Sequence, residues 1–235
     1  SHALHRGFHV VLNIHHFEGL NTNPIANKDK FIALWQQIAE YFKDYPENLY
    51  FEIYNEPNHT LDKYWNQYYP LAYDVIRKQN PSRNIIISCP GWANVTTLDR
   101  LVLPQRIKED PNILVQFHFY YPTEFCFQGA IGNGSEDVQG LRWTGTKAQQ
   151  RDLIQLADRA AAWAKRNGSV RLWNGEFCAH AGVSHEEDRR LWTAFIIQLC
   201  EERNIAWAYW DFAGDTGKIY DVDIGRWTNI LPDFD

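Results

Sequence analysis

The chain has 235 residues, of which 45% are hydrophobic and 22% charged, enough for one large α/β domain or two small ones. Its net charge of −6 and its lack of a basic stripe argue against nucleic acid as a partner, because an acidic protein repels a polyanion. No apolar run reaches the length of a membrane span and no signal peptide is visible, so we expect no membrane partner.

The cysteines are scattered along the chain and form no CxxC pair, which argues against a zinc site. We expect unpaired thiols in or near the core, although the sequence leaves their redox state open. The four positions are Cys89, Cys126, Cys178 and Cys200.

Apolar segments and amphipathic segments alternate along the chain, which predicts an α/β protein with a parallel sheet. Residues 8–14 predict a first strand that is buried on both faces. Strands are predicted at 8–14, from 49 to a stop at Pro57, and at 84–88, 113–117, 171–176 and 205–209. Helices are predicted at 31–42, 61–80, 146–163 and 184–202.

Capping boxes mark the starts of two of these helices. Thr146 with Gln149 predicts one, and Ser184 with Glu187 predicts the other. Between the elements, residues 123–145 form a long loop rich in glycine and polar residues, a type that is often functional. The tail from residue 214 is expected to be irregular.

Polar or aromatic residues follow the apolar body of each predicted strand. In a parallel barrel, the carboxyl ends of the strands share one face, and chemistry is usually placed there. The residues at these ends are His15, Glu56, Trp92, His118, Glu176 and Trp210.

Two of these strand ends carry a carboxylate. Glu56 alone is better interpreted as a solvated loop residue, but Glu176 ends a second strand of the same design. Two carboxylates at strand ends are the minimal equipment for cleaving a glycosidic bond. The pair therefore predicts a glycoside hydrolase.

Five motifs in order make the chain resemble glycoside hydrolase family 5, the cellulase family of (β/α)8 barrels. The resemblance covers nearly the whole sequence and is closest to bacterial endoglucanases of the thermophilic type. The motifs are Ile14-His15-His16, Tyr54-Asn55-Glu56-Pro57, Phe117-His118-Phe119-Tyr120, Asn174-Gly175-Glu176-Phe177 and Ala208-Tyr209-Trp210.

The resemblance implies a role for each motif residue. Glu56 would be the general acid/base and Glu176 the nucleophile of a retaining mechanism. Asn55 would bond the 2-hydroxyl of the sugar in the −1 site, and Trp210 would lie under that sugar. His15, His118 and Tyr120 would orient the carboxylates and the sugar.

Other aromatic and polar residues have two interpretations each. His15 is alternatively a hydrogen-bonded core residue, and His16 is held as a substrate contact. Trp92 and Trp143 are assigned to the cleft wall in preference to the core. Packing is the favoured interpretation of Trp173, His180 and Asp211.

The chain departs from the family in having about six strands where the barrel has eight. It opens at what resembles the third strand, so the arginine that the family carries on its second strand is missing. We expect a single catalytic domain over residues 1–235, truncated at its N-terminus. Either a second copy of the chain or a complementary N-terminal fragment would complete the barrel, unless the sequence is simply incomplete.

The predicted function is a retaining endo-β-1,4-glucanase that acts on a β-glucan polysaccharide and needs no cofactor or metal. A β-mannanase or a xyloglucanase is the alternative within the family. A carbohydrate-binding fragment with weak catalysis is a second alternative. A metal-dependent hydrolase is disfavoured because His15 and His16 are expected to project to opposite sides of their strand. A polymeric substrate implies a secreted protein.

Overall fold

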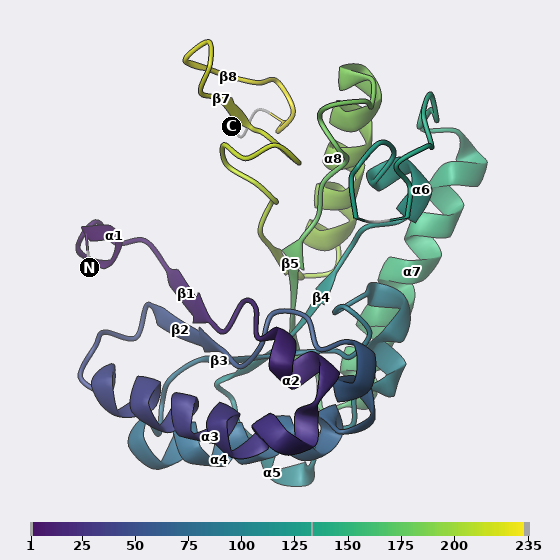
Figure 1. The fold of residues 1–235 in the computed structure, drawn as a ribbon. Helices are drawn as coiled ribbons and strands as arrows, with labels where there is room; N and C mark the ends of the chain where they lie inside the picture. Colours follow the sequence, from purple (N-terminus) through teal and green to yellow (C-terminus); the bar gives the residue numbers. More distant parts are fainter. Residues whose placement is uncertain (1, 133, 233–235) are drawn as a thin grey trace. The chain divides into compact units, whose positions relative to one another are not determined.

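The computed structural model describes residues 2–132 and 134–232, in which parallel strands alternate with helices (Figure 1). Six strands form one sheet in the order β1-β2-β3-β4-β5-β6. They are β1 Val10–Asn13, β2 Leu49–Glu52, β3 Ile85–Ser88, β4 Ile113–His118, β5 Arg171–Glu176 and β6 Ala206–Trp207.

The helices connect consecutive strands, as in repeated β-α units. Short helices are α1 His2–His5, α2 Glu18–Thr22, α5 Gln105–Lys108 and α6 Thr123–Cys126, with 3₁₀ turns at His59–Lys63 and Val95–Arg100. Long helices are α3 Pro24–Tyr41, α4 Trp65–Gln79, α7 Lys147–Arg166 and α8 Glu186–Glu201. None of the described helices is both long and apolar enough to cross a bilayer.

The chain divides into two compact units. Unit 1 runs up to residue 117 and includes residues 163–171, whereas unit 2 comprises residues 118–162 and the residues from 172 on. Strand β4 spans the boundary, so its last residue, His118, belongs to unit 2.

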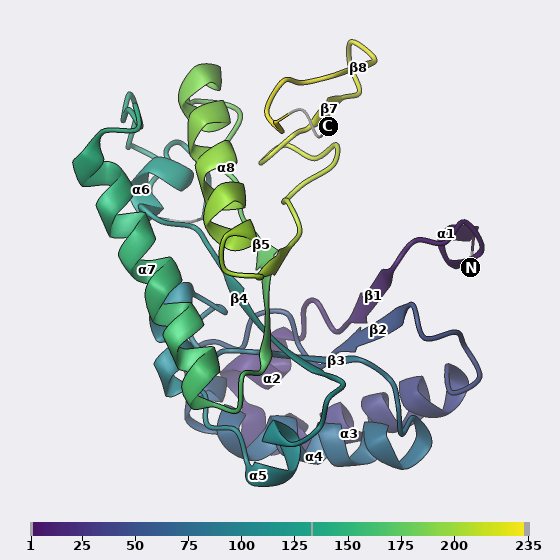
Figure 2. The same ribbon diagram turned by 180° about the vertical axis from the view of Figure 1, so that it is seen from behind.

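In unit 1, α3 and α4 lie side by side against the sheet formed by β1, β2 and β3 (Figures 1 and 2). A buried tryptophan fixes each helix to the sheet. Trp35 of α3 donates its indole N–H to the carbonyl of Ile53 at 2.9 Å, and Trp65 of α4 donates to that of Ser88 at 2.8 Å. Each ring therefore buries a large apolar area while its one polar atom stays bonded.

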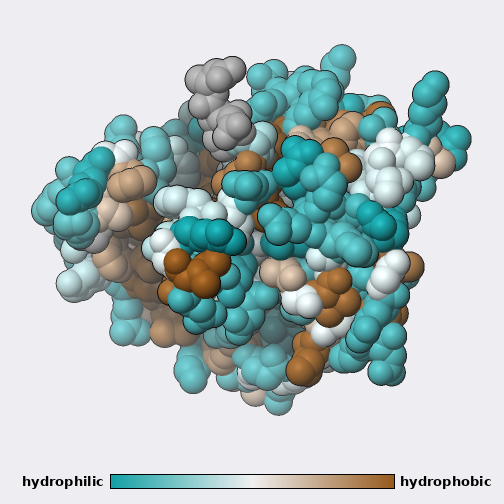
Figure 3. Space-filling view, turned by 90° about the horizontal axis from the view of Figure 1, so that it is seen from above, coloured by the Kyte–Doolittle hydropathy of each residue, from teal (hydrophilic) through white to brown (hydrophobic). Residues whose placement is uncertain are grey.

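Strand β1 is less buried than the sequence predicts. Phe8 is 62% exposed and Val11 is 37% exposed, so the expectation of a strand buried on both faces is wrong. The reason is topological, because β1 comes first in the sheet order and, among the residues that the structure describes, pairs with β2 alone. Hydrophobic side chains are also exposed at separate places among hydrophilic ones on the face shown in Figure 3.

Arg83 anchors the start of β2 and the turn before it through hydrogen bonds. Its guanidinium is buried and donates to four backbone carbonyls, and the ring of Phe51 lies 5.2 Å from it. The four carbonyls belong to Phe42, Tyr45, Pro46 and Leu49. Burial lowers the pKa of Arg83. Its guanidinium has five N–H donors, which bond to backbone carbonyls that helices and strands leave unpaired.

In unit 2, aromatic rings form the core between β5 and α8. Phe177, which follows β5, lies within 6.3 Å of the ring centroids of Trp192, Trp207 and Tyr209. Trp192 is fully buried, and its indole N–H donates to the carbonyl of Tyr121 at 3.0 Å. This bond ties α8 to the segment that follows β4.

Only one of the two predicted capping boxes forms. Thr146 and Gln149 exchange bonds at the start of α7, with Gln149 N–H donating to the Thr146 hydroxyl at 3.4 Å. At α8 the residue before the helix is His185, and the buried hydroxyl of Ser184 has no hydrogen-bond partner among the described residues. Glu187 instead binds Arg190 at 2.8 Å, so the second prediction is wrong.

The long loop of unit 2 is held at both of its ends. Gln128 donates to the carbonyl of Leu141 and accepts from its N–H, both within 3.1 Å. Asp188 of α8 is buried and binds Arg142 through two bonds of 2.5 and 2.9 Å. It also accepts the backbone N–H of Trp143 at 3.0 Å.

The tail is more regular than expected. Tyr220–Asp221 and Arg226–Trp227 form β7 and β8, an antiparallel pair near the end of the chain (Figure 2). The rings of Phe212 and Tyr220 stack with an interplanar angle of 3°, and Trp227 meets both edge-on. The aromatic residues that make this hairpin regular are brought together by tertiary packing.

Candidate active site

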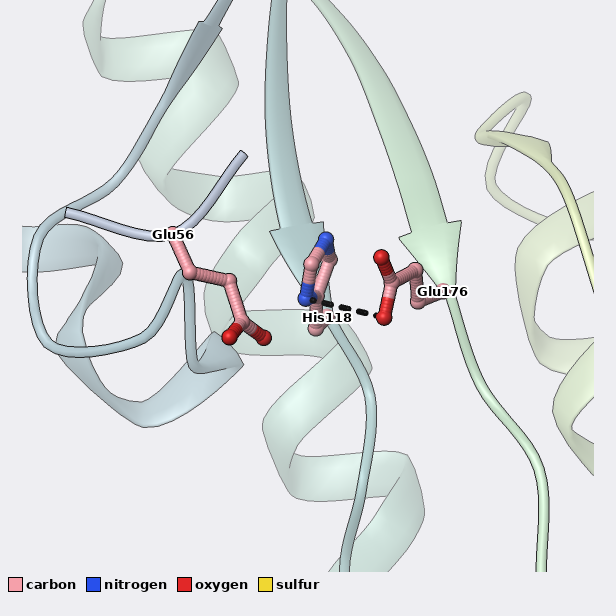
Figure 4. A group of neighbouring side chains, drawn as sticks. All are labelled: Glu56, His118 and Glu176. Carbon is pink, nitrogen blue, oxygen red and sulfur yellow. Dashed lines mark ion pairs between the residues drawn. The ribbon is translucent and has the colours of Figure 1, made fainter. Parts of the chain in front are cut away.

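Glu56 lies on a loop whose backbone is fixed at several points. The chain leaves β2 at Glu52, and Asn55 then donates its N–H to the carbonyl of Ile14 at 3.1 Å. The amide of Asn58 donates to the Glu56 carbonyl at 2.8 Å. The Glu56 side chain extends from this held backbone and is partly exposed (Figure 4).

Asn55 and His15 are brought together in unit 1. Asn55 is 4% exposed, and its Nδ2 lies 3.5 Å from Nε2 of His15. The other ring nitrogen of His15 lies 3.3 Å from Nδ2 of Asn13. Each ring nitrogen of His15 thus faces the amide nitrogen of an asparagine.

The side chains of His15 and His16 contact each other, contrary to expectation. Their ring centroids are 4.6 Å apart and the rings meet edge-on. Strand pairing ends at Asn13, so the alternation of side chains along a strand does not extend to these residues. His16 is exposed, whereas His15 is partly buried.

Trp92 presents its ring at the surface near the Glu56 loop. It is 49% exposed, and its backbone N–H donates to the carbonyl of Pro57 at 3.0 Å. The ring of His59 packs edge-on against it at 5.0 Å between centroids. The indole of Trp92 is therefore a half-exposed apolar surface.

In unit 2, two side chains from the end of β4 and the segment after it contact Glu176, and Figure 4 shows one of them, His118. The hydroxyl of Tyr120 donates to Oε2 of Glu176 at 3.0 Å, and Nδ1 of His118 lies 3.6 Å from the same oxygen. Phe119 N–H donates to the Glu176 carbonyl at 2.9 Å, which fixes the two strand ends. The Glu176 side chain is 13% exposed, so it is largely shielded from solvent.

The tryptophans of unit 2 differ in burial. Trp210 is partly exposed and follows β6, with its backbone N–H donating to the carbonyl of Phe177 at 3.2 Å. Trp143 is 2% exposed and packs against Phe195 at 5.7 Å between centroids. The structure thus places Trp143 in the packing of unit 2, and we leave it out of the proposed sugar contacts.

Asp211 and the thiols also have structural surroundings. The Asp211 carboxylate accepts the N–H groups of Gly214 and Lys218 at 3.2 and 3.0 Å, which shapes the turn after Trp210. All four cysteines are buried and unpaired, as expected. Burial raises the pKa of Cys89 and Cys200 to about 12, and it also raises the pKa of Cys126 and Cys178.

Sequence reasoning missed a buried polar cluster in unit 1. Glu52 is 3% exposed and accepts hydrogen bonds from Asn13 and Gln116. A signal was present in the sequence, since each residue interrupts an otherwise apolar strand. Such residues in a strand core need partners, which the sequence alone does not reveal.

Comparison with known families decides where the chain belongs. Residues 1–216 match the model of the family described as Cellulase (glycosyl hydrolase family 5). The chain belongs to this family. The expected fold class is confirmed, because the six parallel strands and their helices match part of a (β/α)8 barrel.

Curated relatives of this family-5 chain include endoglucanases. Endoglucanase H of Acetivibrio thermocellus is 32% identical over 213 residues, which are 89% of this chain and 21% of that protein. A xyloglucan-specific endo-β-1,4-glucanase of Bacteroides ovatus is 24% identical, over 95% of this chain and 50% of that protein. The chain thus spans between a fifth and a half of these two relatives.

Solved structures of the family superpose closely. Cel5A of Thermotoga maritima in complex with cellobiose has a TM-score of 0.90 at 39% identity, covering 96% of this chain and 71% of that one. The cellulose synthase subunit Z of Clostridioides difficile has a TM-score of 0.89 at 37% identity, covering 96% and 73%.

Proposed function

We propose that this family-5 chain is a retaining endo-β-1,4-glucanase that hydrolyses internal bonds of a β-glucan. The observation that carries the proposal is the setting of Glu176, a shielded carboxylate at a strand end with the Tyr120 hydroxyl on one oxygen. Double displacement on a carboxylate pair needs no cofactor.

Glu176 is the proposed nucleophile. A nucleophilic carboxylate must stay charged, and a hydroxyl that donates to it favours the charged form. Tyr120 supplies that donor at 3.0 Å, and His118 faces the same oxygen at 3.6 Å. These contacts also hold the other oxygen, Oε1, in a defined direction for attack on the anomeric carbon.

Glu56 is the proposed general acid/base. It protonates the leaving glycosidic oxygen in the first step and takes a proton from water in the second. The bonds of its loop fix the backbone while its side chain stays partly exposed. A retaining mechanism requires the two carboxyl groups to lie about 5–5.5 Å apart.

The remaining motif residues are proposed to bind the sugar. Asn55 binds the 2-hydroxyl of the −1 sugar, and Trp210 lies under its apolar face. Trp92 offers a second platform. The residues that line the site with them are His15, His16, His118 and Tyr120.

Two isosteric variants, Glu56→Gln and Glu176→Gln, test the roles on aryl cellobiosides with good and poor leaving groups. Loss of the acid should spare the first step for a good leaving group, whereas loss of the nucleophile should abolish it for both. Glu109→Gln is the matched control, since Glu109 is exposed and accepts from the amide of Gln105. Equal and mild effects of the two site variants would refute the assignment.

The preferred glycan is a separate question, for which mannan and xyloglucan are the second candidates. They are favoured because one relative is named as xyloglucan-specific and one solved relative is described in complex with mannotriose. Initial rates on cellulose, lichenan, glucomannan and xyloglucan rank them. Product release from glucomannan or xyloglucan with none from cellulose or lichenan would overturn the glucanase assignment.

We also propose that the exposed edge of β1 pairs with a further strand, from a second copy or from a separate N-terminal segment. The exposed Phe8 and Val11 support this, because an unpaired apolar edge attracts another strand. Light scattering on the purified chain distinguishes a dimer from a monomer.

Binding of glucan in a native gel without hydrolysis would favour the alternative of a carbohydrate-binding fragment.

A polymeric substrate implies that the protein acts outside the cell, because a polysaccharide cannot reach an enzyme inside it. We therefore propose secretion. Activity in the culture medium of the producing cells, compared with a cytoplasmic marker enzyme, tests this. Activity confined with the marker would contradict it.

A further inference from the structure

Glu52 is a buried carboxylate that the proposed mechanism does not use. It is the last residue of β2 and is 3% exposed, four positions before Glu56. Its Oε2 accepts from Nδ2 of Asn13 at 3.0 Å, and its Oε1 accepts from Nε2 of Gln116. Two amide donors on two oxygens match a carboxylate, which only accepts.

Gln116 connects this carboxylate to the backbone of Asn55. Its Nε2 also lies 3.0 Å from the carbonyl oxygen of Asn55 and 2.8 Å from Oγ of Ser88. The Ser88 hydroxyl in turn donates to the carbonyl of Tyr54. The amide nitrogen of Gln116 therefore faces three oxygen acceptors. This fixes the orientation of the amide, with its nitrogen and not its oxygen toward Glu52.

Asn13 connects the same carboxylate to His15. Because Glu52 only accepts, Asn13 must turn Nδ2 toward it, and this nitrogen also lies 3.3 Å from Nδ1 of His15. Nδ1 of a neutral imidazole then accepts, so the ring proton is on Nε2. Nε2 then carries the proton and lies 3.5 Å from Nδ2 of Asn55; because two donors cannot bond to each other, the Asn55 amide flips so that its Oδ1 accepts.

We propose that Glu52 is a positioning residue that sets the direction of the hydrogen bonds running through Asn13 and His15 to Asn55. With its oxygen bonded to His15, Asn55 keeps its amide N–H groups for the 2-hydroxyl of the bound sugar. This inference rests on the proposed function, because that function supplies the sugar.

Glu52→Gln reverses this direction without changing the size of the side chain. Its oxygen is needed by Gln116, so its amide nitrogen faces Asn13, which must turn its own oxygen toward that nitrogen and toward His15. His15 then carries its proton on Nδ1, and Asn55 turns its oxygen toward the sugar. An oxygen in that place can only accept a hydrogen bond, so it cannot donate to the 2-hydroxyl of the sugar as the N–H group does.

The test compares an aryl β-cellobioside with its analogue that lacks the 2-hydroxyl on the sugar bearing the aryl group. The ratio of kcat/KM for the two substrates should fall about tenfold in Glu52→Gln, the worth of one hydrogen bond. Glu109→Gln, which also loses a carboxylate facing a glutamine amide, should leave the ratio unchanged. A merely structural role of Glu52 would lower both rates and leave the ratio unchanged, which overturns the proposal.

Nitrogen NMR of the His15 ring in the wild-type protein provides a readout without activity. The proposal requires the proton on Nε2, and a proton on Nδ1 overturns it even where Glu52→Gln fails to fold. Asn13→Ala, which removes the link while leaving Glu52 in place, should lower the substrate ratio as Glu52→Gln does. A wild-type protein that cleaves neither substrate refutes the proposed function, while the ring tautomer still decides the role of Glu52.

Discussion

The hydroxyl of Tyr120 donates a hydrogen bond to Oε2 of Glu176 at 3.0 Å, across the ends of β4 and β5 in unit 2. A tyrosine in this place supplies a donor without adding charge, so it stabilises the carboxylate through a hydrogen bond to the ionised group. The relationship links the segment after β4 directly to the proposed nucleophile.

Tyr120→Phe should therefore lower kcat by about tenfold and shift the acidic limb of the pH–rate profile to higher pH. The nucleophile loses a donor that favours its charged form, so more acid-side activity is lost. Tyr69→Phe removes a buried hydroxyl that donates to a backbone carbonyl at 2.6 Å, and it should leave the profile unchanged. A shift of equal size in both variants would contradict the proposed role.

Trp92→Ala should raise KM for a soluble β-glucan with little change in kcat. The exposed indole is proposed to bind the polymer equally in the ground state and the transition state, which affects KM alone. Trp227→Ala is the control, because Trp227 is 64% exposed and has no proposed role in binding. Unchanged kinetics for Trp92→Ala would remove this residue from the site.

Asp188→Asn should lower the free energy of unfolding by about 1–3 kcal/mol, because the buried acceptor of Arg142 and of the Trp143 N–H is weakened. Urea denaturation measures the change. Asp158→Asn, in an exposed pair with Arg203, should change stability by less than about 0.5 kcal/mol.

The same aspartate predicts a pH dependence of stability. The bond from Arg142, which is the main cause, holds the pKa of Asp188 below its usual value, and the Trp143 N–H adds to this. Its contribution is full above the unfolded pKa of about 3.9 and is lost as the pH falls through the lower folded value. The wild type should therefore lose more stability than Asp188→Asn between pH 5 and pH 2, roughly the window of this titration.

The thiols should be inert in the native protein. Only a thiolate reacts rapidly with a disulfide reagent, and burial raises the pKa of Cys89 and Cys200 to about 12. At about pH 8, the native protein should contain no fast-reacting thiol, whereas the unfolded protein should contain four. A fast-reacting thiol in the native state would indicate an opening of the core.

The sequence by itself determined the alternation of strands and helices, the strand that ends at Glu176, and the start of α7 at its capping box, whereas β2 ends at Glu52, before the predicted stop at Pro57, and leaves Glu56 on a loop. These features depend on local periodicity and on residues a few positions apart. The family followed from the same motifs. The single domain over residues 1–235 stays a prediction.

Tertiary structure alone decided which of these residues are buried and what they contact. Trp92 is exposed and Trp143 is buried, although both are tryptophans in loops, because burial depends on residues distant in the chain. Likewise, Glu52 receives its donors from Asn13 and Gln116, which are 39 and 64 positions away in sequence. A buried polar group is stable only when such partners meet it, and only the folded chain brings them together.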